Sequence, residues 1–308
     1  MDEPRTCPPY YRDPSTSTTL THTRACIQHC RTLDPTGTRI TPIITPRFAL
    51  SCLPTTLTAL ATLAQQEALP IQTHISENAA EIALVAELFP RADSYAAVYD
   101  SAGLLTERTI LAHAVHLTEA ERALVSQRKA KVAHCPASNS ALGSGYCAVR
   151  TLLEAGIAVG LGTDVSGGYA VSVLEAVRQA CLVSRTVAFQ HAEAPGGGDA
   201  DARFNIGFVE GLQLATVGGA EVVGMKGRLG DFGVGMLWDV QEIDLRGGGG
   251  EGGGMEDLTT AAAGPVDLFG WETWEEEVAK WVWNGDDRNV RRVWVGGQLV
   301  HEKKGSSH

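Results

Sequence analysis

Residues 70–77 read PIQTHISE, a short apolar run that leads straight into a histidine and an acid. The run is typical of a β-strand, and His74 stands at its end. A neutral imidazole at the mouth of a strand is a common zinc ligand, and Glu77, one short turn later, can reach the same pocket as a proton carrier. Taken alone, the segment fits a capping or surface histidine–glutamate pair better.

Similar apolar runs recur along the chain and alternate with longer helix-like segments. The further strand candidates are RITPIITPRF at 39–48, TILAHAV at 109–115, AKVAHCPASN at 130–139 and IAVGLGTDV at 157–165. Helical patterns lie between them, at residues 57–69, 79–89 and 118–130. Strands that alternate with helices pair in parallel through βαβ units, so the pattern predicts the α/β class. The closed form of this plan is the (β/α)8 TIM-type barrel, and five strands predict a barrel that lacks its first strands.

Each of the five predicted strands carries a polar residue at or near its end. These residues are Arg47, His74, His113, His134 and Asp164. Because the chemistry of such barrels lies at the carboxyl ends of their strands, we expect the five side chains to share one pocket. The order of three histidines and an aspartate predicts a divided metal site.

Several of these residues also have a simpler interpretation. A histidine at a strand end can be buried and satisfied by the backbone, and Asp164 can cap a helix. As a metal ligand, Asp164 would also accept a proton from bound water. Arg47 can pair with a neighbouring acid, but its planar fork beside the ring of Phe48 also suits a flat heterocycle that carries a carbonyl. His116 is predicted to lie in a surface loop.

The sequence divides into three predicted parts. Residues 1–38 form an irregular lead-in with one helix, and residues 39–225 hold the partial barrel. Residues 226–308 are expected to form a C-terminal β-hairpin and helical segment that flanks the barrel, with a flexible glycine-rich insertion at 247–254. The remaining expected elements are helices around 21–32, 172–186 and 208–224, a hairpin at 227–245 and a terminal hairpin at 290–302.

The composition narrows the class of protein and its partners. The 308 residues are 44% hydrophobic and 20% charged, which is typical of a globular protein. The formal charge of −11 argues against nucleic acid and membrane as partners, because both recruit basic surfaces. The sequence shows neither a membrane-spanning run nor a secretory leader, and its seven irregularly spaced cysteines suit reduced thiols, so we expect a cytoplasmic protein.

Taken together, several strings resemble the guanine deaminase branch of the amidohydrolase superfamily. They are ITPRFALSC, QTHISEN, LAHAVHLT, AHCPASN, GLGTDVSGGYAVSVLEAVRQA, LATVGGAEVVG and GDDRNVRRVWVGGQ. The resemblance covers most of residues 38–300, and PRF, HISEN and GTDVSGGY are quite specific within the superfamily. It implies hydrolytic deamination of guanine to xanthine and ammonia, with one zinc ion in each active site and a homodimeric assembly.

The resemblance also implies a role for each matching residue. His74 and Asp164 match zinc ligands of the family, and Glu77 matches the acid that protonates the purine ring. His113 matches a catalytic histidine beside the metal, which binds a second metal in some relatives. Arg47 and Phe48 match the residues that hold guanine, and His74 and Glu77 would border the same substrate.

One part of the family pattern is missing from this sequence. The family holds zinc with a His-x-His pair as well, and no His-x-His occurs in the 308 residues. We therefore expect the sequence to be N-terminally incomplete. Two alternatives stay open: a related amidohydrolase that acts on another aminopurine or a triazine, and an inactive interaction subunit that pairs with an intact copy.

Overall fold

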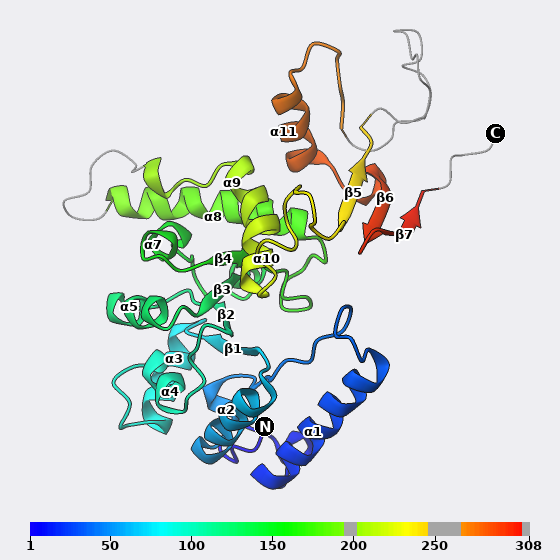
Figure 1. Cartoon of the computed structure of the whole chain (residues 1–308). Helices are drawn as coiled ribbons and strands as arrows, with labels where there is room; N and C mark the ends of the chain where they lie inside the picture. Colours follow the sequence, from blue (N-terminus) through cyan, green and yellow to red (C-terminus); the bar gives the residue numbers. More distant parts are fainter. Residues whose placement is uncertain (194–201, 246–265, 304–308) are drawn as a thin grey trace.

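The computed structural model describes residues 1–193, 202–245 and 266–303 (Figure 1). Its centre is a parallel sheet of four strands, β1 (Ile71–Ile75), β2 (Thr109–His113), β3 (Lys131–His134) and β4 (Val159–Leu161). The strands lie side by side in chain order, and each pairs in parallel with the next. Parallel neighbours need long crossover connections, and helices supply them here. The predicted α/β class is confirmed.

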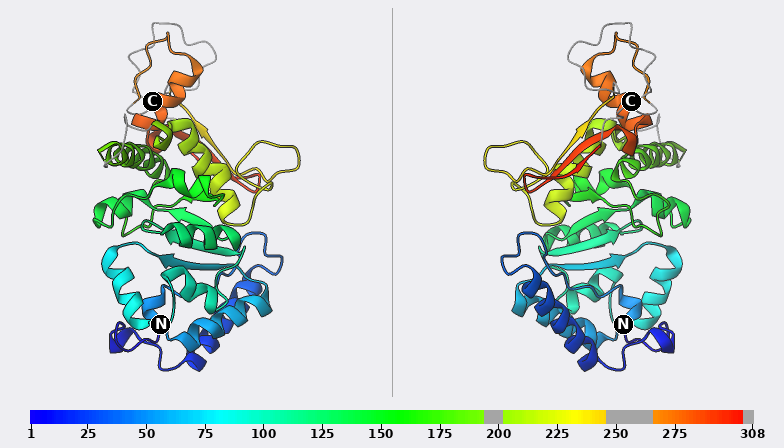
Figure 2. Two further views of the ribbon diagram at one scale, coloured as in Figure 1. Left: turned by 90° about the vertical axis from the view of Figure 1, so that its left-hand side faces the viewer. Right: turned by 90° about the vertical axis from the view of Figure 1, so that its right-hand side faces the viewer.

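Helices connect the strands and pack on the sheet. α2 precedes β1, α3 and α4 connect β1 to β2, α5 connects β2 to β3, and α6 and α7 connect β3 to β4. Figures 1 and 2 show α3, α5 and α7 along the same side of the sheet. The bounds of these helices are Pro54–Glu67 (α2), Ala79–Leu88 (α3), Tyr95–Ser101 (α4), Glu119–Gln127 (α5), Pro136–Ala141 (α6) and Val149–Glu154 (α7).

Capping boxes fix the points at which α3 and α5 begin. The Asn78 side chain accepts a hydrogen bond from the Glu81 amide, and the Glu81 side chain accepts one from the Asn78 amide. Thr118 and Glu121 make the same pair at the start of α5. Such boxes satisfy amides that the first turn leaves free, so they define where each helix starts. Glu77 is therefore held in the short turn between β1 and α3.

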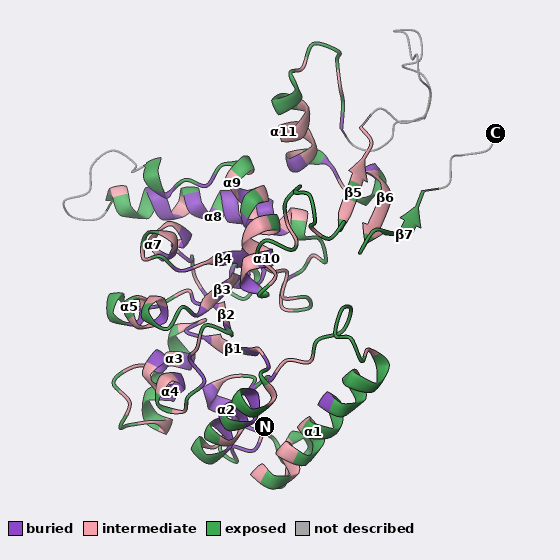
Figure 3. Cartoon of the chain, viewed as in Figure 1, coloured by how far each residue is buried: buried purple, intermediate pink, exposed green. Residues whose placement is uncertain are grey.

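Longer helices lie around this centre. α1 (Thr16–Leu33) begins earlier than predicted, at the cap Ser15, and only Ile27 of its residues is buried (Figure 3). α8 (Val173–Glu193) extends beyond the helix predicted at 172–186. The helix predicted at 208–224 is α9 (Phe208–Gln213), a π-helical turn (Leu214–Gly218) and α10 (Gly219–Val222) in succession.

A small antiparallel sheet follows near the end of the described chain. It consists of β5 (Val240–Ile243), β6 (Val290–Val295) and β7 (Gln298–Glu302), and α11 (Trp274–Asn284) lies between β5 and β6 in the sequence. The hairpin predicted at 290–302 is confirmed as β6 and β7. Gly296 and Gly297 both have positive φ, as a tight two-residue hairpin turn requires. The glycine-rich run predicted at 247–254 lies outside the described residues.

Two predicted β elements are wrong. Residues 39–48 form no strand, and only Ile44 makes a bridge, to Ile71, because Pro42 and Pro46 lack the amide hydrogens that a ladder needs. The predicted hairpin at 227–245 is irregular up to β5, since its repeated glycines offer no side chains to pack in a strand. The parallel sheet therefore has four described strands, and Arg47 enters the site from a loop.

The buried side chains form one main cluster around the parallel sheet. The cluster includes Ile71 and Ile75 of β1, Leu111 of β2 and Val132 of β3. In β1 and β2 the fully buried residues alternate with more exposed ones, because successive strand residues face opposite sides of a sheet. In the described residues, no helix combines the length and the apolar character that crossing a bilayer requires.

Candidate metal centre

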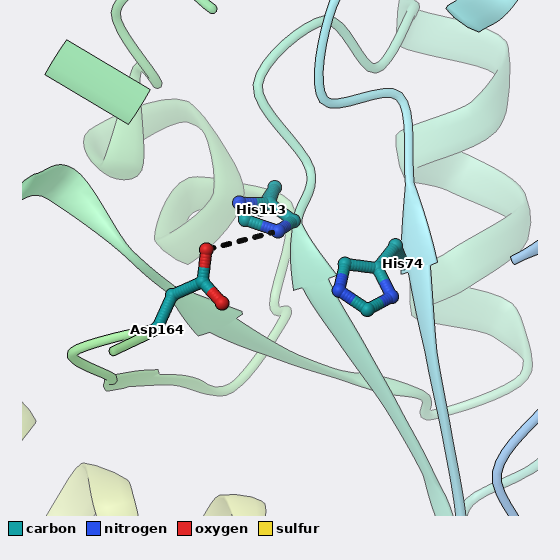
Figure 4. A group of neighbouring side chains, drawn as sticks. All are labelled: His74, His113 and Asp164. Carbon is teal, nitrogen blue, oxygen red and sulfur yellow. Dashed lines mark ion pairs between the residues drawn. The ribbon is translucent and has the colours of Figure 1, made fainter. Parts of the chain in front are cut away.

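Three side chains converge at the carboxyl end of the parallel sheet. His74 lies on β1, His113 is the last residue of β2, and Asp164 lies in the loop after β4 (Figure 4). Each residue offers one ligand atom, and the three atoms lie within 4.8 Å of one another. The rings of His74 and His113 are stacked, with their centroids 5.2 Å apart.

The strand register explains how residues far apart in the sequence meet. His74 pairs with Ala112, and Ile75 pairs with His113, so the ends of β1 and β2 are level. His113 and Asp164 both depart from extended geometry, with positive φ angles of 71° and 46°. Such left-handed backbone is unfavourable for a residue with a Cβ atom, and it clusters at functional sites.

Hydrogen bonds orient both imidazole rings. The Nδ1 atom of His74 lies 2.5 Å from the carbonyl oxygen of Arg47. The Nδ1 atom of His113 lies 2.9 Å from Oδ1 of Asn139, and both residues are buried. Because these partners are acceptors, each Nδ1 carries the proton and donates it. Both Nε2 atoms are therefore left with a lone pair, which is the form that binds a metal.

Two carboxylates flank the Nε2 atom of His113. Glu77 Oε2 is 3.7 Å from it, and Asp164 Oδ2 is 3.9 Å from it. Ser144 donates a hydrogen bond to Glu77 Oε1 at 3.0 Å, and Ser138 donates one to Asp164 Oδ2 at 2.6 Å. These serines fix the two acids, and the sequence gives no periodic signal for either of them.

A glycine makes room for the aspartate. A Cβ atom at Gly167 would lie 2.8 Å from Asp164 Oδ2 and 3.0 Å from the Ser138 hydroxyl oxygen. Contacts this short require a neighbour to move, so the glycine preserves the position of the carboxylate. The GTDVSGG segment thus provides both the acid and the space beside it.

Arg47 and Phe48 lie next to His74, as the sequence predicts. The guanidinium carbon of Arg47 is 5.3 Å from the centroid of the Phe48 ring, which is 6.0 Å from the centroid of the His74 ring. Arg47 is exposed and Phe48 is half-buried. A cation and an aromatic ring therefore border the metal site on one side.

His134 does not share this arrangement. It is buried, and neither ring nitrogen has a hydrogen-bond partner in the described part of the chain. Burial, helped by the nearby His113, lowers the pKa of His134 to about 3. Of the five predicted residues, three therefore converge, Arg47 lies beside His74, and His134 is absent from the converging group. His116 is exposed as predicted, and its Nε2 is 2.7 Å from the carbonyl oxygen of Ser144.

The converging side chains fit a divalent metal ion. Zinc–ligand bonds of about 2.0–2.2 Å place two donors on one ion no more than about 4 Å apart. The observed spread of 4.8 Å is slightly wider, so small side-chain movements would bring the three donors together. Two imidazoles and a carboxylate also give the number of protein ligands that is usual in a catalytic zinc site. His113, predicted as a catalytic residue, offers the third donor.

Comparisons with known proteins agree on the family. The model of the amidohydrolase family, which is metal-dependent, matches residues 7–300. A probable guanine deaminase of Schizosaccharomyces pombe is 46% identical over 95% of this chain and 52% of its own length. The guanine deaminase of Mus musculus is 38% identical over 85% of this chain and 54% of its own length.

A solved structure agrees with the fold. The guanine deaminase of C. acetobutylicum, with guanine bound in its active site, has a TM-score of 0.80 and 30% identity, and the match covers 98% of this chain and 64% of that one. This chain thus spans about half the length of the curated relatives it matches. The match across residues 7–300 and the barrel-type fold lead to one conclusion: the chain belongs to the amidohydrolase family.

Proposed function

We propose that the whole protein hydrolyses guanine to xanthine and ammonia, with zinc as its metal. The observation that carries the proposal is the convergence of the His74, His113 and Asp164 donors beside Glu77 and the Arg47–Phe48 pair. The similarity to guanine deaminases supports the choice of substrate.

His74, His113 and Asp164 would hold the ion. Their donors are nitrogen and carboxylate oxygen, a combination that zinc accepts readily. Zinc, when bound, would lower the pKa of a water molecule to about 7 and so make hydroxide available at neutral pH. Asn139 and the Arg47 carbonyl keep the two histidines in the tautomer that can bind a metal.

The two acids would move the protons. Asp164 takes a proton from the attacking water, and Ser138 holds its carboxylate in place. Glu77 gives a proton to the ring nitrogen next to the carbon that carries the amino group, while Ser144 fixes its other oxygen. Both acids lie within 4 Å of His113 Nε2, so one small substrate can reach both.

Arg47 and Phe48 would select the base. The Arg47 guanidinium donates to the purine carbonyl, and the Phe48 ring packs on the face of the base beside His74. Adenine has an amino group where guanine has this carbonyl, so it would leave the donors without an acceptor. Comparing turnover of guanine, adenine derivatives and a triazine separates this proposal from the related amidohydrolase activities.

A purified sample of the chain tests the proposal directly. The decrease in guanine absorbance is followed after addition of zinc, and the zinc content is measured in parallel. Turnover that depends on about one zinc per chain supports the proposal. A zinc-loaded chain that leaves guanine unchanged would show that this polypeptide is not itself the catalyst, and would favour the role of an interaction subunit.

We further propose a homodimer in the cytoplasm. All seven cysteines lie in the described residues and are free, as in proteins of a reducing compartment. Large apolar side chains near β5 are exposed, including Phe232, Val234 and Trp238, and such patches favour association. Light scattering of the purified chain distinguishes a dimer from a monomer.

A further inference from the structure

Two buried tyrosines of α4 connect the segments that carry the candidate site residues. Tyr99 has no exposed surface, and Tyr95 is 4% exposed. Their ring centroids are 5.4 Å apart, and neither residue belongs to the converging group of metal donors. No sequence pattern singles out either residue, since both lie on the buried face of a short helix.

The hydroxyl of Tyr99 joins two of these segments. It accepts hydrogen bonds from the Ala49 amide and the Thr73 hydroxyl, each at 2.9 Å. It donates to the carbonyl oxygen of His74 at 2.7 Å. One oxygen atom therefore links the residue after Phe48 to the strand residue that carries a metal donor.

The hydroxyl of Tyr95 is connected by hydrogen bonds to the segment that carries Glu77. It donates to Glu81 Oε1 at 2.7 Å, and Glu81 Oε2 accepts the Glu77 amide at 2.8 Å. Burial raises the pKa of both Tyr95 and Tyr99, so both hydroxyls keep the protons that they donate. The two tyrosines thus hold different parts of the site.

The Arg47–Phe48 segment depends on this support more than His74 does. His74 lies within the paired strands β1 and β2. Arg47 and Phe48 lie in a loop. The Arg47 carbonyl attaches this loop to β1, because it accepts the His74 amide, His74 Nδ1 and, at 3.4 Å, the Thr73 hydroxyl, and the Ala49 amide attaches it to α4 by donating to the Tyr99 hydroxyl. Loss of the Tyr99 hydroxyl frees the Ala49 amide and leaves it buried without a partner.

We propose that Tyr99 is a positioning residue that sets the Arg47–Phe48 segment against His74 and thereby determines the affinity for the purine. This inference rests on the proposed function for the identity of the ligand. The position of the segment itself does not depend on that function. Tyr95 acts mainly through Glu81 on Glu77. Its hydroxyl also accepts a long hydrogen bond of 3.4 Å from the Tyr99 hydroxyl, which is weaker than the bonds of 2.7–2.9 Å that join Tyr99 to Ala49, Thr73 and His74, so its loss should disturb the purine-binding segment much less.

Tyr99→Phe and Tyr95→Phe form a matched pair for the test. Each variant removes one buried hydroxyl from the same helix, so their effects on overall stability are comparable. We expect Tyr99→Phe to raise the KM for guanine about five- to tenfold with kcat within about twofold, whereas Tyr95→Phe leaves KM unchanged. Thr73→Val removes another donor to Tyr99 and should change KM in the same direction. It therefore provides the same test if Tyr99→Phe does not fold.

A second readout does not need activity. Hydrogen exchange measured by mass spectrometry should show faster exchange in the peptide that covers residues 48–52 of Tyr99→Phe, and unchanged exchange there in Tyr95→Phe. Equal exchange in the parent and Tyr99→Phe, or equal effects of both variants on KM, would overturn the inference. A parent chain that neither binds nor converts guanine would show that this polypeptide does not carry the proposed function by itself, and hydrogen exchange would still decide the role of Tyr99.

Discussion

Asn139→Ala should weaken zinc binding without unfolding the chain. Asn139 never reaches the proposed ion, but its Oδ1 accepts the Nδ1 proton of His113 at 2.9 Å. Asn139 is 2% exposed and His113 is 1% exposed, so no bulk water replaces the lost acceptor. Without the acceptor, the proton can move to Nε2, where it occupies the lone pair that the metal needs.

The size of the effect follows from this geometry. Loss of a hydrogen bond that orients a ligating histidine lowers metal affinity about 10- to 100-fold, which corresponds to about 1.4–2.7 kcal/mol. The freed Nδ1 hydrogen is buried, which places the expected loss near the upper end. Alanine at residue 139 is compatible with α6, so the helix itself should persist.

Zinc affinity is measured by competition with a coloured chelator, and thermal unfolding is followed in the same samples. Ser140→Ala is the matched control, because Ser140 lies next to Asn139 on α6 and is exposed. Equal zinc affinity for Asn139→Ala, Ser140→Ala and the parent would refute the assignment of His113 as a donor. A decrease confined to Asn139→Ala supports it.

Three further changes test other parts of the site. Glu77→Gln should retain zinc and lower kcat about 10²- to 10⁴-fold. Glu119→Gln changes an exposed glutamate and should keep both the zinc and the kcat of the parent. Unchanged turnover of Glu77→Gln would remove Glu77 from the mechanism. Gly167→Ala should lower zinc affinity about tenfold, because the new Cβ atom would contact Asp164. Gly207→Ala is the control in the same titration, because a Cβ atom at residue 207 has no atom of the described residues within 4 Å. The pKa of His134 in the folded chain, about 3, lies below its value in the unfolded chain, so protons bind the unfolded chain first as the pH falls. The metal-free chain should therefore lose about 2 kcal/mol of its free energy of unfolding between pH 6.5 and pH 5. Urea unfolding of His134→Met should show a smaller decrease over the same pH range.

The sequence predicts the centre of the fold well because local signals agree there. The apolar runs before His74, His113 and His134 became β1, β2 and β3, and the helical patterns between them became α3 and α5. Each run is a short stretch of apolar residues that ends in a polar residue. The capping residues Asn78 and Thr118 mark the points at which the helices start. The strand predicted at 39–48 failed because its two prolines outweigh its apolar residues.

The supporting residues of the site could not be predicted in this way. Ser138, Asn139 and Ser144 act on partners that are 26 to 67 residues away in the sequence, so no local pattern reveals them. His134 shows the opposite difficulty, since its position at a strand end resembles that of the other histidines. Only the structure shows that His134 is buried without a hydrogen-bond partner among the residues it describes and is absent from the converging group, which apolar spacing does not determine. The proposed division at residues 38 and 225 stays a prediction.

The left-handed backbone at His113 and Asp164 means that the residues needed for metal binding are not the most stable ones at these positions. Glycine adopts that conformation freely, whereas a residue with a Cβ atom is destabilised there by roughly 1–2 kcal/mol. Substituting glycine at either position would remove a metal donor and relieve local strain at the same time. A screen that selects only for thermal stability would therefore favour variants that are more stable but no longer bind the metal.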